Sequence, residues 1–550
     1  MRYFTTGDES RAIDNKTINE TGIPQLVLME RASLALAEEI AKAAAAGSRL
    51  LFVAAGGNNG GDGVAAARIM KEWGYDTEVL FVDALSKTSD AFRTQISIAE
   101  SCGVKITVTS DAGVSFEGYD VIVDALFGVG LSRNIEGIWK DIICRINEIK
   151  SKNSGRVLIV SADIPSGISS ESGKVMGEAI KADMTVTFGF IKRGMLFGEG
   201  REYSGRIVIR DIGFPAHVTK EVGPLCYGLD KADIRKMLPV RRADANKGNF
   251  GRLLLVAGSR DICGAAVIAG RAAFSMGAGL VKIFTDKANR DIICSSLPEA
   301  LIETYDSEEL EEKSDGPKKE DGSTISDGLE KFDVVGTALR EKIRKAVEWC
   351  TAAAIGPGTG TGETAKLILK EVLDAAAETG KTVVIDADGI NIFSGDRSIL
   401  KDRKPSGDER NIILTPHILE MARLIRENGE DIRETVEKIK NDRFEVAKKA
   451  SNEYNMILVL KDARTVVTAG ADSFYINTNG NSGMAKGGSG DSLTGIIGAL
   501  TAGGMEPFVA ARAGTFIHGA AGDKAAEEKG MTGMTAMDLN GCIRKVLEEL

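Results

Sequence analysis

Short apolar segments alternate with helical stretches along most of this chain, and this alternation restricts the folds that it can adopt. In the first half, apolar runs cover residues 49–54, 78–82, 120–125, 157–163 and 184–188. Stretches with apolar residues at helical spacing separate these runs. Strands that alternate with helices build a parallel sheet with helices on both faces. The first half therefore predicts an α/β domain with a mostly parallel sheet.

The pattern restarts after residues 223–239, and a second series of strands follows. The predicted strands are 252–257, 281–285, 352–355, 383–386, 412–414, 457–460 and 465–468, with a helix at 264–276. A chain of 550 residues exceeds what one hydrophobic core supports. We therefore expect two three-layer α/β/α domains, residues 1–222 and 223–550. Residues 1–45 are predicted to be helical, and another helix is expected from Val64 to Trp73.

One segment interrupts the second series. Residues 303–330 hold eleven acidic residues and three lysines around Gly316-Pro317. High charge with few apolar residues is typical of solvated chain. We expect a mobile insertion without a catalytic role.

Composition excludes several classes of function. The net charge of -10 is opposite to the basic footprint of nucleic-acid binding, so an anionic ligand would need backbone amides or a bound cation. The seven cysteines contain no CxxC pair and the three histidines lack metal-ligand spacing, which predicts reduced thiols and no zinc or iron site. With neither a signal peptide nor an apolar run of spanning length visible, we expect a cytoplasmic protein without a membrane role.

A glycine-rich loop follows the first strand of the sheet. Residues 56–63 read GGNNGGDG and lie between strand 49–54 and the helix expected from Val64. Glycines at such a position let backbone amides approach an anion, and the helix N-terminus adds positive potential. A tight turn alone would explain the glycines. Asn58, Asn59 and Asp62 add polar side chains that a turn does not require, which favours a ligand site.

Two further strands end in an aspartate. Asp124 closes the strand at 120–125, and Asp163 closes the strand at 157–163. Ligands of open α/β sheets bind at the carboxyl ends of strands. Either aspartate alone has the simpler interpretation of a helix cap. Three converging loops of this chemistry favour a binding site.

These loops together resemble the NAD(P)H-hydrate epimerase family. The resemblance rests on NNGGDG at 58–63, VDALFGVG at 123–130 and SADIPSG at 161–167, and it covers about residues 1–215. It implies a Rossmann-like domain that binds a potassium ion through Asn59, Asp124 and Ser166. The substrate-binding residues that it implies are Asn58, Asn59, Gly60, Gly61, Asp62, Gly128, Val129, Gly130, Leu131, Ser132, Arg133, Asn134 and Asp163.

The implied chemistry requires a proton carrier. A hydrated nicotinamide ring has a hydroxyl on the carbon beside the ring nitrogen, and inverting that carbon breaks and forms a C–O bond with proton transfer. Asp163 is the candidate general acid and base, because one carboxyl can deliver and recover this proton.

The second half carries another glycine-rich segment. Gly487, Gly488, Ser489, Gly490 and Asp491 precede an expected helix at 492–500. Successive amides at a helix N-terminus can hold a phosphoryl group during transfer, and Asp491 would take the proton of an attacking hydroxyl. The simpler interpretation makes Asp491 an N-cap and the glycines a flexible turn.

This segment resembles the ribokinase-like superfamily and, more narrowly, NAD(P)H-hydrate dehydratase. The supporting motifs, which span about residues 238–500, are NKGNFG at 246–251, GAA at 264–266, GAGLV at 277–281, IGPGTG at 355–360, DADGIN at 386–391 and LTPH at 414–417. Thr359 replaces the usual leucine of this family, and Lys486 and Ser489 replace threonines. Lys486 would add affinity for phosphate.

The dehydratase resemblance also assigns residues. Contacts to the hydrate are implied for Ala265, Gly358, Gly360, His417 and Asp491. Contacts to the nucleotide are implied for Lys461, Asp462, Ala463, Arg464, Thr465, Gly487, Gly488, Ser489 and Gly490. For His417 a structural role in the core stays open. Bacterial members of the family use ADP as phosphoryl donor, ATP is not excluded, and magnesium would shield the phosphates.

Both resemblances on one chain predict a bifunctional isomerase and lyase. One domain would interconvert the R and S hydrates of NADH and NADPH (NADHX and NADPHX), and the other would dehydrate the S form while ADP becomes AMP and phosphate. The alternative is a small-molecule kinase of the vitamin-precursor type, fused to a non-catalytic nucleotide-binding domain. We also expect a homo-oligomer.

Overall fold

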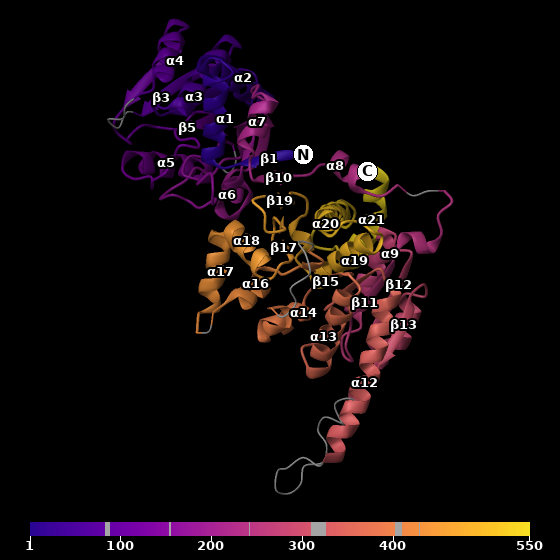
Figure 1. Cartoon of the computed structure of the whole chain (residues 1–550). Helices are drawn as coiled ribbons and strands as arrows, with labels where there is room; N and C mark the ends of the chain where they lie inside the picture. The colour runs from indigo at the N-terminus through magenta and orange to yellow at the C-terminus, as the bar shows by residue number, and fades with distance from the viewer. Residues whose placement is uncertain (83–87, 153–155, 241–242, 310–325, 402–409, 428) are drawn as a thin grey trace. The chain divides into compact units, whose positions relative to one another are not determined.

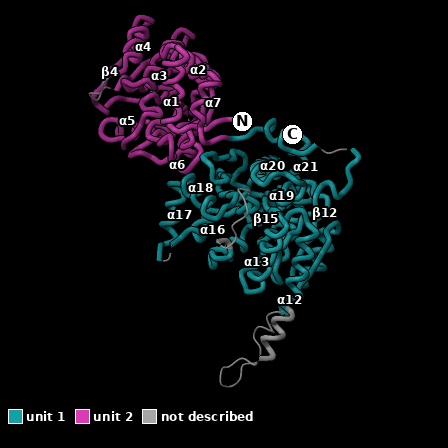
Figure 2. The backbone as a smooth tube through the Cα atoms, viewed as in Figure 1, with its two compact units in different colours: residues 1, 228–550 teal, residues 2–227 magenta. Residues whose placement is uncertain are grey.

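The computed structural model describes residues 1–82, 88–152, 156–240, 243–309, 326–401, 410–427 and 429–550. It contains two compact units, residues 2–227 and residues 228–550 with Met1 (Figure 2). Both units are α/β with mostly parallel sheets, so the predicted fold class is confirmed. All seven cysteines are free thiols. In the described ranges, every helix is too short or too polar to cross a lipid bilayer.

The first unit builds its sheet from alternating strands and helices (Figure 1). Its strands are β1 (Arg2–Thr5), β2 (Arg49–Ala54), β3 (Asp76–Val82), β4 (Lys105–Thr109), β5 (Val121–Ala125), β6 (Leu158–Ala162), β7 (Met184–Phe188), β8 (Ile191–Lys192), β9 (Arg206–Arg210) and β10 (Cys226–Gly228), which reaches the unit boundary. Its helices are α1 (Gly7–Asn19), α2 (Gln25–Ala43), α3 (Asn58–Glu72), α4 (Asp90–Ser101), α5 (Ile138–Lys152), η1 (Arg193–Leu196), α6 (Gly198–Tyr203) and α7 (Ala216–Val222).

The main sheet of this unit is parallel and has the order β4-β3-β2-β5-β6-β7-β9. Alternate residues of β2 point to opposite faces. Leu50 and Phe52 join the core with α2, α3 and α4, whereas Leu51 and Val53 join the core with α5. Helices therefore cover both faces, and the carboxyl ends of β2, β5 and β6 meet at one edge.

Two predicted helices differ from those observed. Residues 1–45 form β1, α1 and α2 instead of one helix, because Gly22 takes a left-handed φ of 79° and Pro24 precedes α2. Thr6 and Glu9 form a capping box that starts α1. Helix α3 begins at Asn58 instead of Val64, so most of the predicted glycine loop is the first turns of a helix.

The second unit repeats this construction with longer connections. Its strands are β11 (Arg252–Val256), β12 (Leu280–Asp286), β13 (Leu301–Tyr305), β14 (Ala352–Ile355), β15 (Thr382–Ile385), β16 (Ile412–Leu414), β17 (Ile457–Leu460), β18 (Val466–Thr468) and β19 (Phe474–Ile476). Its helices are α8 (Lys231–Met237), η2 (Lys247–Phe250), α9 (Gly264–Met276), η3 (Lys287–Asn289), α10 (Arg290–Ser296), α12 (Ser326–Trp349), α13 (Glu363–Glu378), α14 (Asp388–Gly395), α15 (Ser398–Lys401), α16 (Ile418–Ile425), α17 (Ile432–Asn441), α18 (Arg443–Glu453), η4 (Ser482–Met484), α19 (Ser489–Ala502), α20 (Pro507–Lys529) and α21 (Ala536–Glu549).

The strands of the second unit follow the order β13-β12-β11-β14-β15-β16-β17-β18-β19. Pairing is parallel from β13 to β17, and β18 and β19 continue as antiparallel strands. Val256, Ile355 and Leu414 face the core shared with α13 and α16. On the other face, Gly498 of α19 lies so close to Leu253 that an added Cβ would meet its methyl at 3.0 Å.

The predicted insertion is partly ordered structure. Residues 301–305 form β13, which pairs in parallel with β12, and Tyr305 is buried against Phe284. Helix α12 begins at Ser326. The prediction was therefore wrong at both ends of the segment. At its start, the acidic composition masked the apolar pattern of an edge strand that has one buried aromatic residue, Tyr305. The remaining predicted mobile part, residues 310–325, lies outside the described residues.

Candidate functional site

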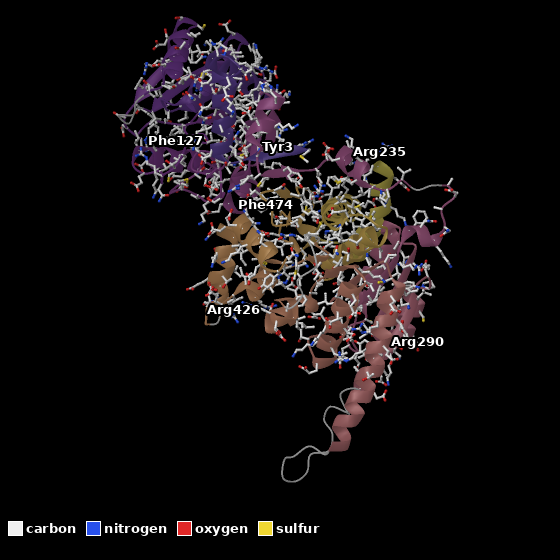
Figure 3. The ribbon with its side chains drawn as sticks, viewed as in Figure 1. Tyr3, Phe127, Arg235, Arg290, Arg426 and Phe474 are labelled. Carbon is white, nitrogen blue, oxygen red and sulfur yellow. The ribbon has the colours of Figure 1, made fainter. Side chains whose placement is uncertain are left out.

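A cavity of about 870 Å³ opens at the carboxyl edge of the first unit's sheet. It collects residues from all three loops that the sequence singled out. Of the residues predicted to bind the hydrate, its walls include Asn58, Asn59, Asp62, Gly128, Val129, Gly130, Leu131, Ser132, Arg133, Asn134 and Asp163. Phe127, labelled in Figure 3, adds an apolar wall. The predicted residues therefore meet at one cavity on this edge of the sheet, and their contact with the hydrate stays a prediction.

Gly60 and Gly61 lie behind the cavity wall. A Cβ on Gly60 would come within 1.7 Å of the Ala55 carbonyl oxygen, and one on Gly61 within 2.7 Å of the Met29 methyl. Gly63 is equally restricted, because an added Cβ would lie 2.4 Å from the Cβ of Ala125. These glycines let the start of α3 pack closely on the end of β2, on α2 and on β5. Substrate contact by Gly60 and Gly61 stays a prediction.

Asp163 lies at the cavity in an uncommon backbone conformation. Its φ is 65°, a left-handed value that few residues other than glycine adopt. Its carboxylate forms an ion pair with Lys192 and accepts a hydrogen bond of 3.2 Å from the Phe188 amide. Lys192, whose side chain is only 2% exposed, also donates to Thr187 Oγ1 at 3.0 Å. The surroundings thus fix both the position and the charge partner of Asp163.

Two more carboxyls share this cavity. Burial, with the negative charge of Asp163 in second place, raises the pKa of Asp14 from 3.8 to about 6. Burial also raises the pKa of Asp62 well above its usual range, and the charges of Asp163 and Asp14 add to the shift. Sequence reasoning missed Asp14 and Lys192. Neither has a local signal, since Asp14 lies on an ordinary amphipathic helix and Lys192 ends a two-residue strand.

The residues predicted to bind potassium come from three elements. Asp124 is near the end of β5, Ser166 follows β6, and Asn59 is in the first turn of α3. Asp124 is fully buried and accepts hydrogen bonds from Ser161 Oγ at 2.8 Å, Ser166 N at 2.9 Å and Ser166 Oγ at 2.5 Å. Burial is the main cause that raises the pKa of Asp124, and these hydrogen bonds oppose it. The carboxamide of Asn59 is buried without a hydrogen-bond partner among the described residues. The buried carboxylate of Asp124 and the unsatisfied carboxamide oxygen of Asn59 are oxygen groups of the kind that bind a monovalent cation.

The second glycine segment begins helix α19. This helix starts at Ser489 instead of residue 492, with Gly488 at its N-cap in a left-handed conformation. Asp491 therefore lies in the first turn, which removes its interpretation as the N-cap. Gly487 is exposed, and residues 488–491 are partly exposed, so the amides at this helix start can reach a ligand. Burial and then the charge of Asp386 raise the pKa of Asp491 to about 6.

A buried ion pair lies next to this helix start. Lys461 Nζ is 2.6 Å from Asp386 Oδ1, and Thr494 Oγ1 donates to Asp386 Oδ2 at 2.8 Å. The ammonium group lies beside Gly490, where an added Cβ would be 3.3 Å from Nζ. A cation thus flanks the exposed amides of α19. Asp386 and Thr494 are site residues to which the sequence analysis gave no role.

His417 is not a core histidine. Its side chain is 48% exposed, and Nδ1 accepts hydrogen bonds from the amides of Leu419 and Glu420 at 3.1 and 3.2 Å. Burial and then the charge of Lys461 lower the pKa of His417. Neutral imidazole with Nδ1 as acceptor leaves Nε2, 3.3 Å from Glu420 Oε1, as the donor. Burial raises the pKa of Glu420 to about 7.

The other residues predicted for this site are distributed over neighbouring loops. Gly358 lies against Ala265, where an added Cβ would be 3.1 Å from the alanine Cβ, and the Gly360 amide donates to Asp388 at 2.9 Å. Lys486 does not extend toward a phosphate site. Its ammonium donates to the carbonyls of Thr532 and Met534 at 2.6 Å each.

The predicted nucleotide loop follows β17. Asp462 pairs with Arg443 at 2.9 Å, Arg464 donates to the Thr478 carbonyl at 2.6 Å, and Thr465 Oγ1 is 3.4 Å from the Asp462 carbonyl. Ala463 is exposed between them. These contacts hold the loop that carries Lys461, while contact of the loop with nucleotide stays a prediction.

Comparison with known proteins adds an independent observation. A family described as NAD(P)H-hydrate dehydratase matches residues 253–545, and one described as YjeF-related protein N-terminus matches residues 25–194. The chain is 33% identical to the bifunctional NAD(P)H-hydrate repair enzyme Nnr of Moorella thermoacetica, over 100% of this chain and 97% of that protein. It is 32% identical to the Nnr of Thermofilum pendens, over 98% of this chain and 95% of that protein.

A solved structure is also similar to part of the chain. The ADP/ATP-dependent NAD(P)H-hydrate dehydratase of Bacillus subtilis, co-crystallised with ATP and Mg²⁺, is 27% identical, with a TM-score of 0.44. The match covers 58% of this chain and 97% of that one. The full-length matches and the two family matches give one result: this chain belongs to the bifunctional NAD(P)H-hydrate repair enzymes.

Proposed function

We propose that this enzyme repairs hydrated NADH and NADPH in two steps on one chain. The first unit interconverts the R and S hydrates, and the second returns the S hydrate to the reduced nucleotide while ADP becomes AMP and phosphate. The observation that carries the proposal is that each unit has its own aspartate, Asp163 or Asp491, at a strand end or helix start that can receive a phosphorylated ligand.

In the first unit Asp163 is proposed to act as general acid and base at the hydrated carbon. Its proton converts the ring hydroxyl into a water leaving group. As the C–O bond breaks, the lone pair of the ring nitrogen forms a C=N bond to the same carbon. Water then adds to the ring and gives up a proton. Lys192 and the Phe188 amide hold the carboxylate at a fixed position during proton transfer.

Asn59, Asp124 and Ser166 are proposed to hold a potassium ion. The support is the buried, unpartnered carboxamide of Asn59 and the buried charge of Asp124. When bound, the ion would supply positive charge near the substrate phosphates and fix the three loops relative to one another.

In the second unit Asp491 is proposed to take the proton of the hydrate hydroxyl. The resulting oxygen attacks the terminal phosphoryl group of ADP, and phosphate then leaves the ring by elimination. A pKa of about 6 leaves Asp491 mostly ionised at neutral pH, as a base requires. The amides at the start of α19 and the ammonium of Lys461 would hold the phosphoryl oxygens. Magnesium, bound with the nucleotide, would neutralise phosphate charge.

The test incubates the full chain with R and S NADHX, NADPHX, potassium and magnesium, with ADP or ATP as donor. Consumption of both epimers, with NADH or NADPH, AMP and phosphate formed in equal amounts from ADP, is expected. A stable phosphorylated product without return of NADH would instead indicate a small-molecule kinase. Light scattering on the same sample measures the expected homo-oligomer.

A further inference from the structure

We propose that Asp14 is a second catalytic residue of the epimerase, which carries a proton for one face of the ring while Asp163 serves the other. The proposal rests on the epimerase function proposed above. It adds a residue that lies more than 40 positions before the first glycine-rich segment.

Asp14 reaches the reaction cavity from an element of its own. It comes from α1, whereas Asp62 comes from α3 and Asp163 follows β6, and all three line the same cavity. No hydrogen bond or ion pair reaches the Asp14 carboxyl from the part of the chain that the structure describes. Asp163 is instead bound by Lys192. Asp14 is thus a partly buried acid that faces the cavity without a structural partner.

Inversion involves two proton transfers, and two carboxyls can divide them between the two faces of the ring. On one face, an acid protonates the hydroxyl, the C–O bond breaks with its electrons on oxygen, and the nitrogen lone pair forms a C=N bond. On the opposite face, water adds to this carbon, the C=N electrons return to nitrogen, and a base takes the proton of the water. After one inversion, the first carboxyl is ionised and the second is protonated. The reverse inversion starts from that state.

The other groups at the cavity suit this role less well. Burial raises the pKa of Asp62 well above its usual range, which favours the protonated form and makes Asp62 less suited to release and recover a proton in turn. The guanidinium groups of Arg11 and Arg133 stay charged, and Arg11 donates to the Val129 carbonyl at 3.0 Å. Glu136 is exposed. Asp14, with a pKa of about 6, exchanges protons in both directions near neutral pH.

The test compares Asp14→Asn, Asp14→Ser and Asp163→Asn in the full chain. Asp90→Asn is the matched control, because it removes an exposed carboxylate at the start of α4, outside the cavity. Each protein receives pure R or S NADHX in H₂¹⁸O, and epimerisation and ¹⁸O entry into the starting epimer are followed by chromatography and mass spectrometry. The no-enzyme rates are subtracted. Dehydratase activity of the second unit reports that each chain is folded.

We expect the Asp14 and Asp163 variants to epimerise about 10²- to 10⁴-fold more slowly than wild type. Each keeps ¹⁸O entry without inversion, Asp14 variants for one epimer and Asp163→Asn for the other, because the remaining carboxyl still serves one face. Asp90→Asn behaves as wild type. Epimerisation by either Asp14 variant within threefold of wild type, or loss of ¹⁸O entry for both epimers in both variants, overturns the proposal. An inactive wild-type chain would instead overturn the epimerase function itself.

Discussion

Each unit has an aspartate that forms an ion pair with a lysine, but the paired aspartate has a different proposed role in each unit. In the first unit Lys192 pairs with Asp163, whereas Asp14 forms no ion pair within the described part of the chain and has a pKa of about 6. Asp163 is the residue that we propose as acid and base. The lysine of this unit therefore holds the proposed reacting carboxyl in place.

In the second unit the pairing is reversed. Lys461 pairs with Asp386, and the predicted base, Asp491, has no hydrogen-bond or ion-pair partner among the described residues and a pKa of about 6. Thr494 occupies the other oxygen of Asp386, so the paired aspartate only anchors the lysine. In both units the lysine fixes the aspartate with which it pairs, and an aspartate without such a pair among the described residues has a pKa raised to about 6.

The largest expected effect separates the two units functionally. Asp491→Asn removes the unpaired carboxyl of the second unit and should lower NADHX dehydration about 10²- to 10⁴-fold. Epimerisation of the same chain should stay at the wild-type rate, because Asp491 belongs to the other compact unit. Rates of both reactions on one preparation measure this. A dehydration rate within threefold of wild type would contradict the proposed role of Asp491 as the base of the second unit.

Removing Lys192 tests how much its ion pair with Asp163 contributes to the stability of the first unit. Lys192→Met leaves Asp163 buried beside Asp14 and Asp62, and loss of one partner of a buried pair costs about 3–5 kcal/mol. Hydrogen exchange of first-unit peptides should show this loss at pH 8 and a smaller one at pH 5, where Asp14, with a pKa of about 6, is mostly protonated and repels Asp163 less. The double variant Lys192→Met/Asp163→Asn should recover part of the stability. Equal loss in single and double variants would argue against the charge effect.

The pH dependence of stability tests the unpaired aspartate of the first unit. The native pKa of Asp14, about 6, lies above its ordinary 3.8, so the folded chain binds the proton more tightly and loses stability as pH rises from about 4 to about 6. Asp14→Asn should therefore stabilise the first unit at pH 8 by about 1–3 kcal/mol and have little effect at pH 3.5. Thermal unfolding across this range measures it. A gain that does not change with pH would contradict the shifted pKa.

The smallest expected effect concerns the cation of the first unit. Potassium at ten times its dissociation constant should stabilise the wild-type first unit by about 1.4 kcal/mol relative to choline at equal ionic strength. Asn59→Ala should lose this gain, because the unpartnered carboxamide oxygen is removed. Exchange of second-unit peptides is the internal control. A potassium effect that survives in Asn59→Ala would place the ion elsewhere.

Central strands could be predicted from the sequence, and edge strands could not. The segments 352–355, 412–414 and 457–460 came out at their predicted bounds, since central strands of a parallel sheet form continuous apolar runs. The sequence analysis missed β4 and β9, the two edges of the first sheet, because exposed residues interrupt their apolar pattern.

The parallel α/β class, the glycine-rich segments close to helix starts and the aspartates close to strand ends could be predicted from the amino-acid sequence. These features depend on local backbone requirements, such as the left-handed Gly488 before α19, and local requirements can be read from neighbouring residues. Which lysine meets which aspartate, and that Asp14 reaches the cavity, depends on the folded arrangement of distant segments. Charges interact through space and burial, and the partners Asp386 and Lys461 are 75 positions apart in the chain.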